Sequence, residues 1–589
     1  MTAPPGAVTG FPSDVLTDRL QRALGAAFGP EYADVDPVIR PSQFADYQAN
    51  VALALAKRLG SNPRAVADAI VTHLDVAGVA QAPVVSGPGF VNLTLADQWL
   101  ADRVTALAAD PRLAVPEQEP LVVPIDYSAP NVAKEMHVGH LRTTVVGDAL
   151  ARTLEHLGHR VVRQNHIGDW GTPFGMLIEH LLEVGEHSPE SELLVSDPNA
   201  FYQAARAKFD ADEAAGGQDF AARARRRVVS LQAGDPETLR LWHELIELST
   251  TYFNSIYSLL DVTLTDDDLA GESSYNDDLP GICDELERKG IATMSDGALC
   301  VFLDGFTGRE GKPQPLIIRK SDGGYGYATT DLATIRHRVT DLHADRVLYV
   351  IGAPQDLHLR MVFAAAREAG WLPDDVEVVH VQIGNVLGPD GKILKTRSGA
   401  PIRLRALLDE AVARAAAGLA ESRPDLDEEE RAVIARQVGI GAVKYADLSV
   451  AHDSEYTFDL DRMVSLMGNT GPYLQYAAAR IRSILRRAEE AEAVAGDVRV
   501  GEEAERALML ALLGFAPVVV QVGEALEPHR LCTYLFELAQ TFTTFYDNCP
   551  VLKGDDLDVR ASRLTLCRVT LAVLDQGLGL LGIAAPERM

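Results

Sequence analysis

The chain has 589 residues, of which 47% are hydrophobic, and its formal net charge is −30. This length corresponds to about four domains of ordinary size, and the hydrophobic share is normal for a folded globular protein. The acidic balance argues against a surface that binds nucleic acid over its whole extent, but it allows a local basic groove because salt screens charges over short distances. The five cysteines form no CxxC pair, so neither a disulfide framework nor a structural zinc site is expected.

The amino-terminal residues "MTAPPGAVTGFPSDVL" lack the basic and then apolar pattern of a secretory signal. No run of 18 apolar residues occurs, so no membrane span is expected. Together with the cysteine usage, these features predict a cytoplasmic protein.

Residues 1–115 are predicted to form a small α+β unit. "DYQANVALALAKRLG" (46–60) has apolar residues at helical spacing. "NPRAVADAIVTHL" (62–74) indicates a second helix, with Asn62 as its cap and Pro63 in its first turn. Apolar and polar residues then alternate from Phe90 to Leu95, which predicts a strand.

Residues 116–405 repeat a strand, helix, strand pattern. "LVVPIDY" (121–127) is an apolar run suited to a buried parallel strand, and residues 138–157 indicate a helix. Further strands are expected in "HRVVRQNHIGDWG" (159–171), "DRVLYVIGAP" (345–354) and "VEVVHVQIGNVLG" (376–388), the last two on either side of the helix "HLRMVFAAAREAG". The alternation predicts a doubly wound parallel α/β sheet that binds a nucleotide.

Two further regions complete the chain. Between about residues 184 and 315, helical segments and the acidic loop "TLTDDDLAGESSYNDDL" (263–279) interrupt the sheet pattern, so this stretch is interpreted as an insertion. Residues 406–589 are amphipathic helices almost throughout, which predicts an α-helical bundle.

The segment "NVAKEMHVGHLRTTVVGDALAR" (131–152) places His137 and His140 where the first strand gives way to a helix. The two histidines could cap the helix, hold a metal or contact a phosphate, and no ligand set of known spacing supports the metal. The helix N-terminus offers free N–H groups to an anion, and Gly139 lets phosphates approach closely. Imidazoles there can donate to oxygens that gain charge. The context favours an ATP site in which the α-phosphate reacts.

A second segment, "GPDGKILKTRSG" (388–399), is flanked by glycines and carries Lys392, Lys395 and Arg397. Alone it could be an ordinary solvated turn. Because it follows a strand of the same sheet as the histidine pair, we interpret it as a loop that closes on a triphosphate and binds the departing pyrophosphate.

At this point a family resemblance is plain. The chain resembles class I aminoacyl-tRNA synthetases, and specifically the arginyl-tRNA synthetase family, over nearly its whole length. The resemblance rests on segments that occur in the family's order: "DYQANVALALAK", "GPGFVNLTL", "YSAPNVAKEMHVGHLRTT", "NHIGDWGTPFGMLI", "SDGGYGYATTDLATIRHR", "GAPQDLHLRMVF", "VLGPDGKILKTRSG" and "GNTGPYLQYAAARIRSIL".

The resemblance implies an arginine–tRNA ligase that uses ATP with Mg²⁺ on its phosphates and no zinc, is monomeric, and activates arginine only when tRNA is bound. It implies that residues 1–115 are an appended tRNA-binding domain, residues 116–405 the catalytic domain and residues 406–589 an anticodon-binding domain. His137 and His140 would stabilise adenylate formation, and Lys395, Thr396, Arg397 and Ser398 would lie in the signature loop called KMSKS.

This loop departs from the family pattern because "LKTRS" lacks the second lysine. Lys134 is the candidate for the missing cation, although a solvent-facing loop lysine is the alternative. The implied ATP-binding residues are His137, Gly139, His140, Lys392, Lys395, Thr396 and Ser398.

The resemblance also implies an arginine site. Asp126 and Asp331 would flank the guanidinium, which stays charged and presents a planar fork of donors. Asn131 would hold the α-amino or carboxylate end, Tyr327 would form a wall, and Gln355 would contact the substrate. The family allows Glu at the position of Asp126. The alternative for Asp331 is a helix cap, a role that is compatible with substrate binding.

For tRNA, one face of the helix near residue 473 carries Tyr473, Tyr476, Arg480 and Arg487. Aromatic stacking and phosphate-pairing arginines suit an anticodon platform, while the alternative is that both tyrosines belong to the core. The run "ARARRRVV" (222–229) could contact the tRNA acceptor arm or be a solvated helix face.

Two rival functions remain from the sequence. A small-molecule nucleotidylyltransferase would share the histidine motif but ignore tRNA, and the long helical domain argues against it. The second rival is a non-catalytic relative of the synthetases, which binds tRNA or arginine as a regulator. The intact pair of phosphate motifs argues against this function.

Overall fold

The computed structural model describes residues 10–308, 311–321, 323–395 and 402–589. Its N-terminal unit packs three helices on a four-stranded antiparallel sheet of order β1-β2-β4-β3. The helices are α1 (Pro12–Phe28), α2 (Val51–Leu59) and α3 (Pro63–His73), and the strands are β1 (Ile39–Pro41), β2 (Tyr47–Ala49), β3 (Val84–Ser86) and β4 (Phe90–Leu93).

One sequence prediction is wrong here and one is confirmed. Tyr47–Ala49 form β2 rather than the start of a helix, because their backbone pairs with β4, and α2 begins only at Val51. Asn62 caps α3 as predicted, since its side chain accepts a hydrogen bond from the Arg64 backbone N–H at 2.8 Å.

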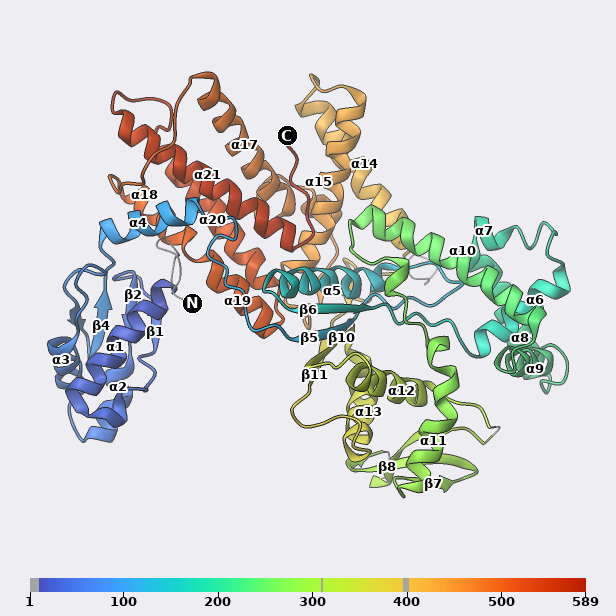
Figure 1. Ribbon diagram of the computed structural model, residues 1–589. Helices are drawn as coiled ribbons and strands as arrows, with labels where there is room; N and C mark the ends of the chain where they lie inside the picture. Colours follow the sequence, from blue (N-terminus) through green and yellow to red (C-terminus); the bar gives the residue numbers. More distant parts are fainter. Residues whose placement is uncertain (1–9, 309–310, 322, 396–401) are drawn as a thin grey trace.

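The central sheet is parallel and has the order β11-β10-β5-β6. Its strands are β5 (Val122–Asp126), β6 (Arg160–Gln164), β10 (Arg346–Gly352) and β11 (Glu377–Ile383). Helix α5 (Val138–His156) lies on one side of the sheet, and α12 (Tyr327–Thr340) and α13 (Asp356–Glu368) lie on the other (Figure 1). The doubly wound α/β prediction is therefore confirmed. Ligands of such sheets bind outside the carboxyl ends of the strands.

The insertion between β6 and β10 contains more sheet than predicted. Its first part is helical, with α6 (Thr172–Val184), α7 (Leu193–Ser196), α8 (Pro198–Ala214), α9 (Phe220–Gln232) and α10 (Pro236–Leu260). After α11 (Leu279–Arg288) comes a three-stranded antiparallel sheet of β7 (Ala292–Ser295), β8 (Ala298–Thr307) and β9 (Pro313–Arg319). The interpretation as helices and an acidic loop missed this sheet.

The predicted C-terminal bundle is confirmed. It comprises α14 (Leu404–Ser422), α15 (Glu428–Leu448), α16 (Leu460–Met463), α17 (Gly471–Glu490), α18 (Glu503–Leu512), α19 (Phe515–Ala525), α20 (His529–Asn548) and α21 (Leu557–Leu580). A short parallel pair, β12 (Val386–Leu387) with β13 (Tyr456–Thr457), joins the bundle to the catalytic region. Helix α4 (Asp97–Ala108) connects the N-terminal unit to the bundle and contacts α18 and α21.

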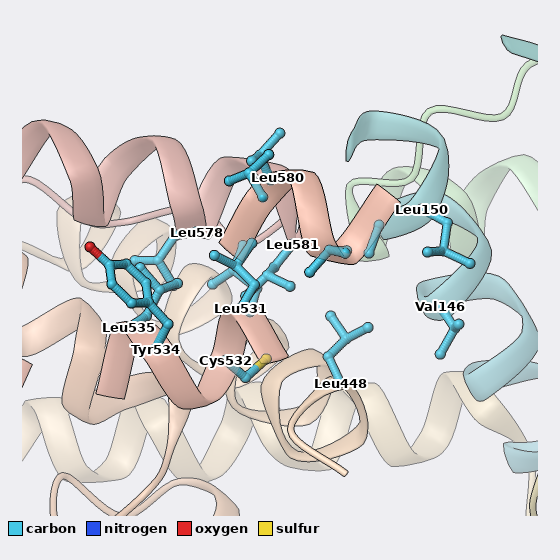
Figure 2. Close-up of a cluster of buried hydrophobic side chains, with 14 of the residues drawn as sticks. Val146, Leu150, Leu448, Leu531, Cys532, Tyr534, Leu535, Leu578, Leu580 and Leu581 are labelled. Carbon is cyan, nitrogen blue, oxygen red and sulfur yellow. The ribbon is translucent and has the colours of Figure 1, made fainter. Parts of the chain in front are cut away.

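The bundle shares a hydrophobic core with α5 (Figure 2). Val146 and Leu150 of α5 lie near Leu448 of α15 and Leu531 of α20, and all four side chains are buried. Each fully buried side chain of this size contributes about 1.5–3 kcal/mol of transfer free energy. The helix that begins at the histidine pair is therefore anchored by the C-terminal domain.

The stretch Glu503–Ala525 is long and apolar enough, by length and composition, to cross a membrane. In the structure it forms two helices, α18 and α19, which pack against α20, and half of its most apolar 18-residue window is buried. Core helices of folded proteins pass the same test, so this is only a weak indication of a membrane segment.

Candidate active site

The two histidines hold the start of α5 through their own rings. His137 is the N-cap residue, and its Nδ1 accepts a hydrogen bond from the Gly139 backbone N–H at 3.0 Å. Nδ1 of His140 accepts a hydrogen bond from the His137 backbone N–H at 3.1 Å. Because both Nδ1 atoms are acceptors, each neutral ring carries its proton on Nε2. The capping interpretation is therefore correct, and it leaves two Nε2–H donors for a ligand oxygen.

Both rings are neutral near pH 7. Burial, together with the nearby charges of His137 and Lys134, lowers the pKa of His140 to about 3, although the hydrogen bond with the His137 backbone raises it. Burial, and then Lys134, also lowers the pKa of His137. The ring centroids are 4.0 Å apart, so two uncharged donors lie side by side. Uncharged donors of this kind can stabilise negative charge that develops on a phosphate without holding a fixed counter-ion.

The absence of a side chain at Gly139 leaves room for the ring of His137 as well as for a ligand. It is exposed, and a Cβ built on it would lie 2.8 Å from Cε1 of His137. Such a distance is shorter than van der Waals contact allows, so a larger residue would displace the ring that caps α5.

The chain that follows the signature loop returns to the histidine turn. His137 and Arg403 form an antiparallel bridge, the Val138 N–H donates to the Ile402 carbonyl at 3.0 Å, and the Leu404 N–H donates to the Met136 carbonyl at 2.9 Å. These bonds bring two segments that are far apart in the sequence into contact at one site.

Before the loop, the Leu394 N–H donates to the Val386 carbonyl at 2.9 Å, which makes a tight turn next to β12. Lys392 and Lys395 are exposed at this turn. Thr396, Arg397 and Ser398 lie outside the described residues, so their predicted roles remain predictions.

Lys134 and Glu135 connect the histidine turn to the insertion. The Lys134 ammonium lies 4.3 Å from the ring centroid of Tyr202 on α8. Glu135 pairs with Arg403 at 2.8 Å, and Arg403 also pairs with Asp197, the N-cap of α8, at 3.0 Å. Lys134 is partly buried against an aromatic ring, rather than fully exposed.

Asp126 lies at the carboxyl end of β5, as expected, but it already has a cationic partner. Its Oδ2 accepts a hydrogen bond from Nη2 of Arg338 at 2.9 Å, and the two residues are 4% and 0% exposed. Arg338 also stacks on Tyr349, with its guanidinium carbon 4.8 Å from the ring centroid. Oδ1 of Asp126 is buried without a hydrogen-bond partner.

Asp331 and Tyr327 both lie at the start of α12. The cap position of this helix is Gly326, so Asp331 is not a helix cap. Instead its Oδ2 accepts a hydrogen bond from Nε2 of His358 at 2.5 Å, and this bond raises the pKa of His358. Tyr327 is 72% exposed.

Gln355 and Asn131 are also exposed near the carboxyl ends of the strands. Gln355 is the N-cap residue of α13, three positions before His358. Asn131 forms a parallel bridge with Gly168, in the turn that follows β6. Asp126 ends strand β5, and the other predicted arginine-site residues are on the loops and helix starts at this end of the sheet, where Asn131, Tyr327 and Gln355 are exposed.

Glu272 is a further candidate site residue that the sequence analysis did not single out. Its N–H donates to the Ile167 carbonyl at 3.2 Å, beside the turn that bridges Asn131. Burial, and then the nearby Asp169 and Asp331, raise the pKa of Glu272 to about 8, and Glu272 contributes to raising the pKa of Tyr327. The negative charges of Asp169 and Asp331 therefore act on the Glu272 carboxyl group. A bound cation would relieve this repulsion.

The predicted anticodon platform is divided between core and surface. Tyr473 packs edge-on against Phe536 with ring centroids 5.5 Å apart, and Arg480 lies over Tyr546 at 4.3 Å. Tyr476, by contrast, is 43% exposed, and Arg487 is also exposed.

The basic run 222–229 is largely neutralised within the insertion. Arg223 and Arg227 both pair with Glu179, and Arg225 pairs with Glu213. These contacts favour a charged helix face balanced by its own neighbours over a strongly positive tRNA-binding surface.

Among the described residues, no group of three or more His, Cys, Asp or Glu side chains is arranged to hold a metal ion. The five cysteines are free and buried.

A doubly wound parallel sheet, a histidine pair at a helix start and the pairing of that turn with residues 402–404, which follow a basic segment, are the features of a class I aminoacyl-tRNA synthetase. Comparison with known proteins agrees with this class. A family model described as "tRNA synthetases class I (R), catalytic domain" matches residues 104–460. Models of the "DALR anticodon binding domain" and the "Arginyl tRNA synthetase N terminal domain" match residues 474–589 and 14–95.

Curated relatives match the whole chain. An arginine–tRNA ligase of Thermobifida fusca is 71% identical over 98% of this chain and 100% of its own length. One of Frankia casuarinae is 53% identical over 98% of this chain and 99% of its own length.

Solved structures agree. The arginyl-tRNA synthetase of Plasmodium falciparum covers 98% of this chain and 99% of its own, with a TM-score of 0.81 and 27% identity. The arginyl-tRNA synthetase of Thermus thermophilus covers 98% of this chain and 100% of its own, with a TM-score of 0.80 and 26% identity. The chain belongs to the arginyl-tRNA synthetase family, and the resemblance found in its sequence is confirmed.

Proposed function

We propose that this chain attaches L-arginine to its cognate tRNA in two steps. Its family membership supports this activity, and curated relatives carry the name arginine–tRNA ligase. The observation that carries the chemistry is the joining of the histidine turn to the end of the signature loop, through the His137–Arg403 bridge and its flanking backbone bonds.

In the first step, the arginine carboxylate attacks the α-phosphate of ATP, pyrophosphate leaves and arginyl-adenylate forms. The Nε2–H groups of His137 and His140 donate to the phosphate oxygens that gain charge, with Gly139 leaving room beside them. Lys134, Lys395 and Arg397 supply the cations that neutralise the departing pyrophosphate.

The remaining ATP contacts come from the segment 388–399, which contains the signature loop. Lys392, Thr396 and Ser398 bind the nucleotide as the loop closes. Mg²⁺ arrives as part of the substrate, bound to the ATP phosphates, since it prefers phosphate oxygens and water to an all-protein cage. No zinc takes part.

The acidic cluster selects arginine. Asp331 and Glu272 pair with the guanidinium, and the free oxygen of Asp126 forms a further acceptor at the end of β5. Tyr327 forms a wall of the pocket, Asn131 holds the α-amino or carboxylate end, and Gln355 contacts the substrate. Burial, and then repulsion from Asp169 and Asp331, raises the pKa of Glu272. This supports the role, because a guanidinium beside Glu272 would offset that repulsion and favour the charged carboxylate.

In the second step, a hydroxyl of the terminal adenosine of the tRNA attacks the acyl carbon and AMP leaves. Tyr473, Tyr476, Arg480 and Arg487 contact the anticodon region, and residues 1–115 make a further tRNA contact. Arginine activation requires bound tRNA. The protein acts as a cytoplasmic monomer with no membrane attachment.

The test is the transfer of labelled arginine to acid-precipitable RNA with ATP and total tRNA. We expect arginine-dependent and ATP-dependent counts from the native chain and a large loss for His140→Ala. A chain that turned over ATP but labelled no RNA would be a small-molecule nucleotidylyltransferase, and one that bound arginine or tRNA without turnover would be a regulator. Full arginylation by His140→Ala would show that the phosphate assignment is wrong.

A further inference from the structure

The insertion reaches the ATP site through one helix, α8. Tyr202, in the second turn of α8, presents its ring face to the ammonium of Lys134 at 4.3 Å from the centroid. Lys134 is in turn near enough to the histidines that its charge lowers the pKa of both. The ammonium therefore contacts an aromatic ring of the insertion, and its charge acts on both histidines of the turn.

The start of α8 is fixed to the same turn. Asp197 caps α8 by accepting a hydrogen bond from the Ala200 N–H at 3.1 Å, and it also accepts one from Nη2 of Arg403 at 3.0 Å. Arg403 pairs with Glu135, which follows Lys134 directly, at 2.8 Å. Arg403 therefore links the helix that carries Tyr202, through Asp197, to the segment that carries Lys134, through Glu135.

A lysine needs such a constraint more than most residues do. Its ammonium is a point charge on a flexible four-carbon chain, which samples many rotamers when nothing holds it. An aromatic face attracts a cation through its quadrupole, and it does so without neutralising the charge as a carboxylate would. A ring can thus keep Lys134 close to the phosphate site and leave its charge available.

We propose that Tyr202 is a positioning residue for adenylate formation, and that its ring holds the Lys134 ammonium beside His137 and His140. The insertion thereby completes the ATP site of the central sheet. This inference rests on the proposed role of Lys134 as the cation that replaces the missing second lysine of the signature loop.

The experiment compares three variants of the full chain by ATP–pyrophosphate exchange with arginine and tRNA present. Tyr202→Leu removes the ring, Tyr202→Phe keeps the ring, and Gln203→Ala alters the exposed neighbour on the same helix. We expect Tyr202→Leu to lower kcat/KM for ATP about tenfold while the KM for arginine stays unchanged. Tyr202→Phe and Gln203→Ala should remain within about twofold of the native chain.

A double-mutant cycle of Tyr202→Leu with Lys134→Ala shows whether Tyr202 acts by positioning Lys134 or by stabilising the structure in general. If Tyr202 acts through Lys134, adding Tyr202→Leu to Lys134→Ala causes no further loss. Equal losses in the two backgrounds, an unchanged Tyr202→Leu variant, or a Tyr202→Phe variant as poor as Tyr202→Leu would each overturn the proposal. Tyr202→Met serves as a second variant without a ring if the leucine variant is poorly folded.

The proposed function fails by a different result, namely the absence of arginylation by the native chain. A Lys134→Ala variant with the same kinetics as the native chain would overturn the positioning proposal and leave the ligase activity in place.

Discussion

Arg142 of α5 and Asp447 of α15 form an ion pair of 2.8 Å in which the two side chains are 1% and 0% exposed. Nη1 and Nη2 of the same arginine donate to the carbonyls of Ser454 and Ala451, at 2.6 and 3.3 Å. The segment they hold leads to β13, which pairs with β12 just before the signature loop. The helix that carries the histidines is thus joined, through one buried arginine, to the strand pair that precedes the loop.

We expect Asp447→Asn to lower the free energy of unfolding by about 3–5 kcal/mol, because it leaves the buried charge of Arg142 without its counter-ion. Urea unfolding measures the change. The double variant Arg142→Met with Asp447→Leu should recover much of the loss, since it removes both charges. A loss below about 1 kcal/mol for Asp447→Asn would show that the pair behaves like a surface salt bridge.

His140→Asn and His140→Ala should separate the two functions of this ring. The asparagine side-chain oxygen can replace Nδ1 as acceptor for the His137 N–H, but neither variant presents a donor at the position of Nε2. We expect both to lose about 10²–10³-fold in the rate of adenylate formation. Only His140→Ala should also lower the melting temperature. A fully active His140→Asn variant would contradict the assignment of Nε2–H as the donor.

Arginine binding should depend on pH through Glu272. Its pKa of about 8 means that the free protein holds a proton there below pH 8, and a guanidinium partner must displace that proton. Arginine affinity should therefore rise as the pH goes from 6 to 8, by at most about tenfold per unit. Titration calorimetry in buffers of different ionisation enthalpy would detect the released proton.

Glu272→Gln is the matched control for this pH dependence. It should weaken arginine binding and flatten the pH profile between 6 and 8. The same group also affects folding: its folded pKa lies above its ordinary value of 4.5, so its contribution to stability is present at low pH and is lost as the pH rises through about 8. A steep profile that survives in Glu272→Gln would assign the titration to another group.

The sequence revealed those features that local patterns determine. Apolar runs and helical periodicity were sufficient to predict β5, α5 and the C-terminal helices, and the Asn62 cap followed from its position before a proline. Glu272 was hidden within an acidic loop, because only the tertiary fold buries it where the charges of Asp169 and Asp331 act on it. The β7–β9 sheet lies in a region whose other segments are helical.

The partners of the predicted residues were also invisible in the sequence. The pattern that placed Asp126 at the end of a buried strand could not reveal that Arg338, 212 positions away, occupies one of its oxygens. The contact of Lys134 with Tyr202 likewise depends on how the insertion folds back over the histidine turn.

Tyr476 and Tyr473 should respond differently to replacement, although they lie on the same helix. Tyr476 is exposed, so Tyr476→Ala should raise the KM for tRNA about tenfold if a base stacks on this ring, with little change in stability. Tyr473 packs on Phe536, so Tyr473→Ala should lower the free energy of unfolding by roughly 1–3 kcal/mol. Arginylation kinetics with varied tRNA and urea unfolding of both variants test the pair. An unchanged tRNA KM for Tyr476→Ala would remove this residue from the tRNA interface.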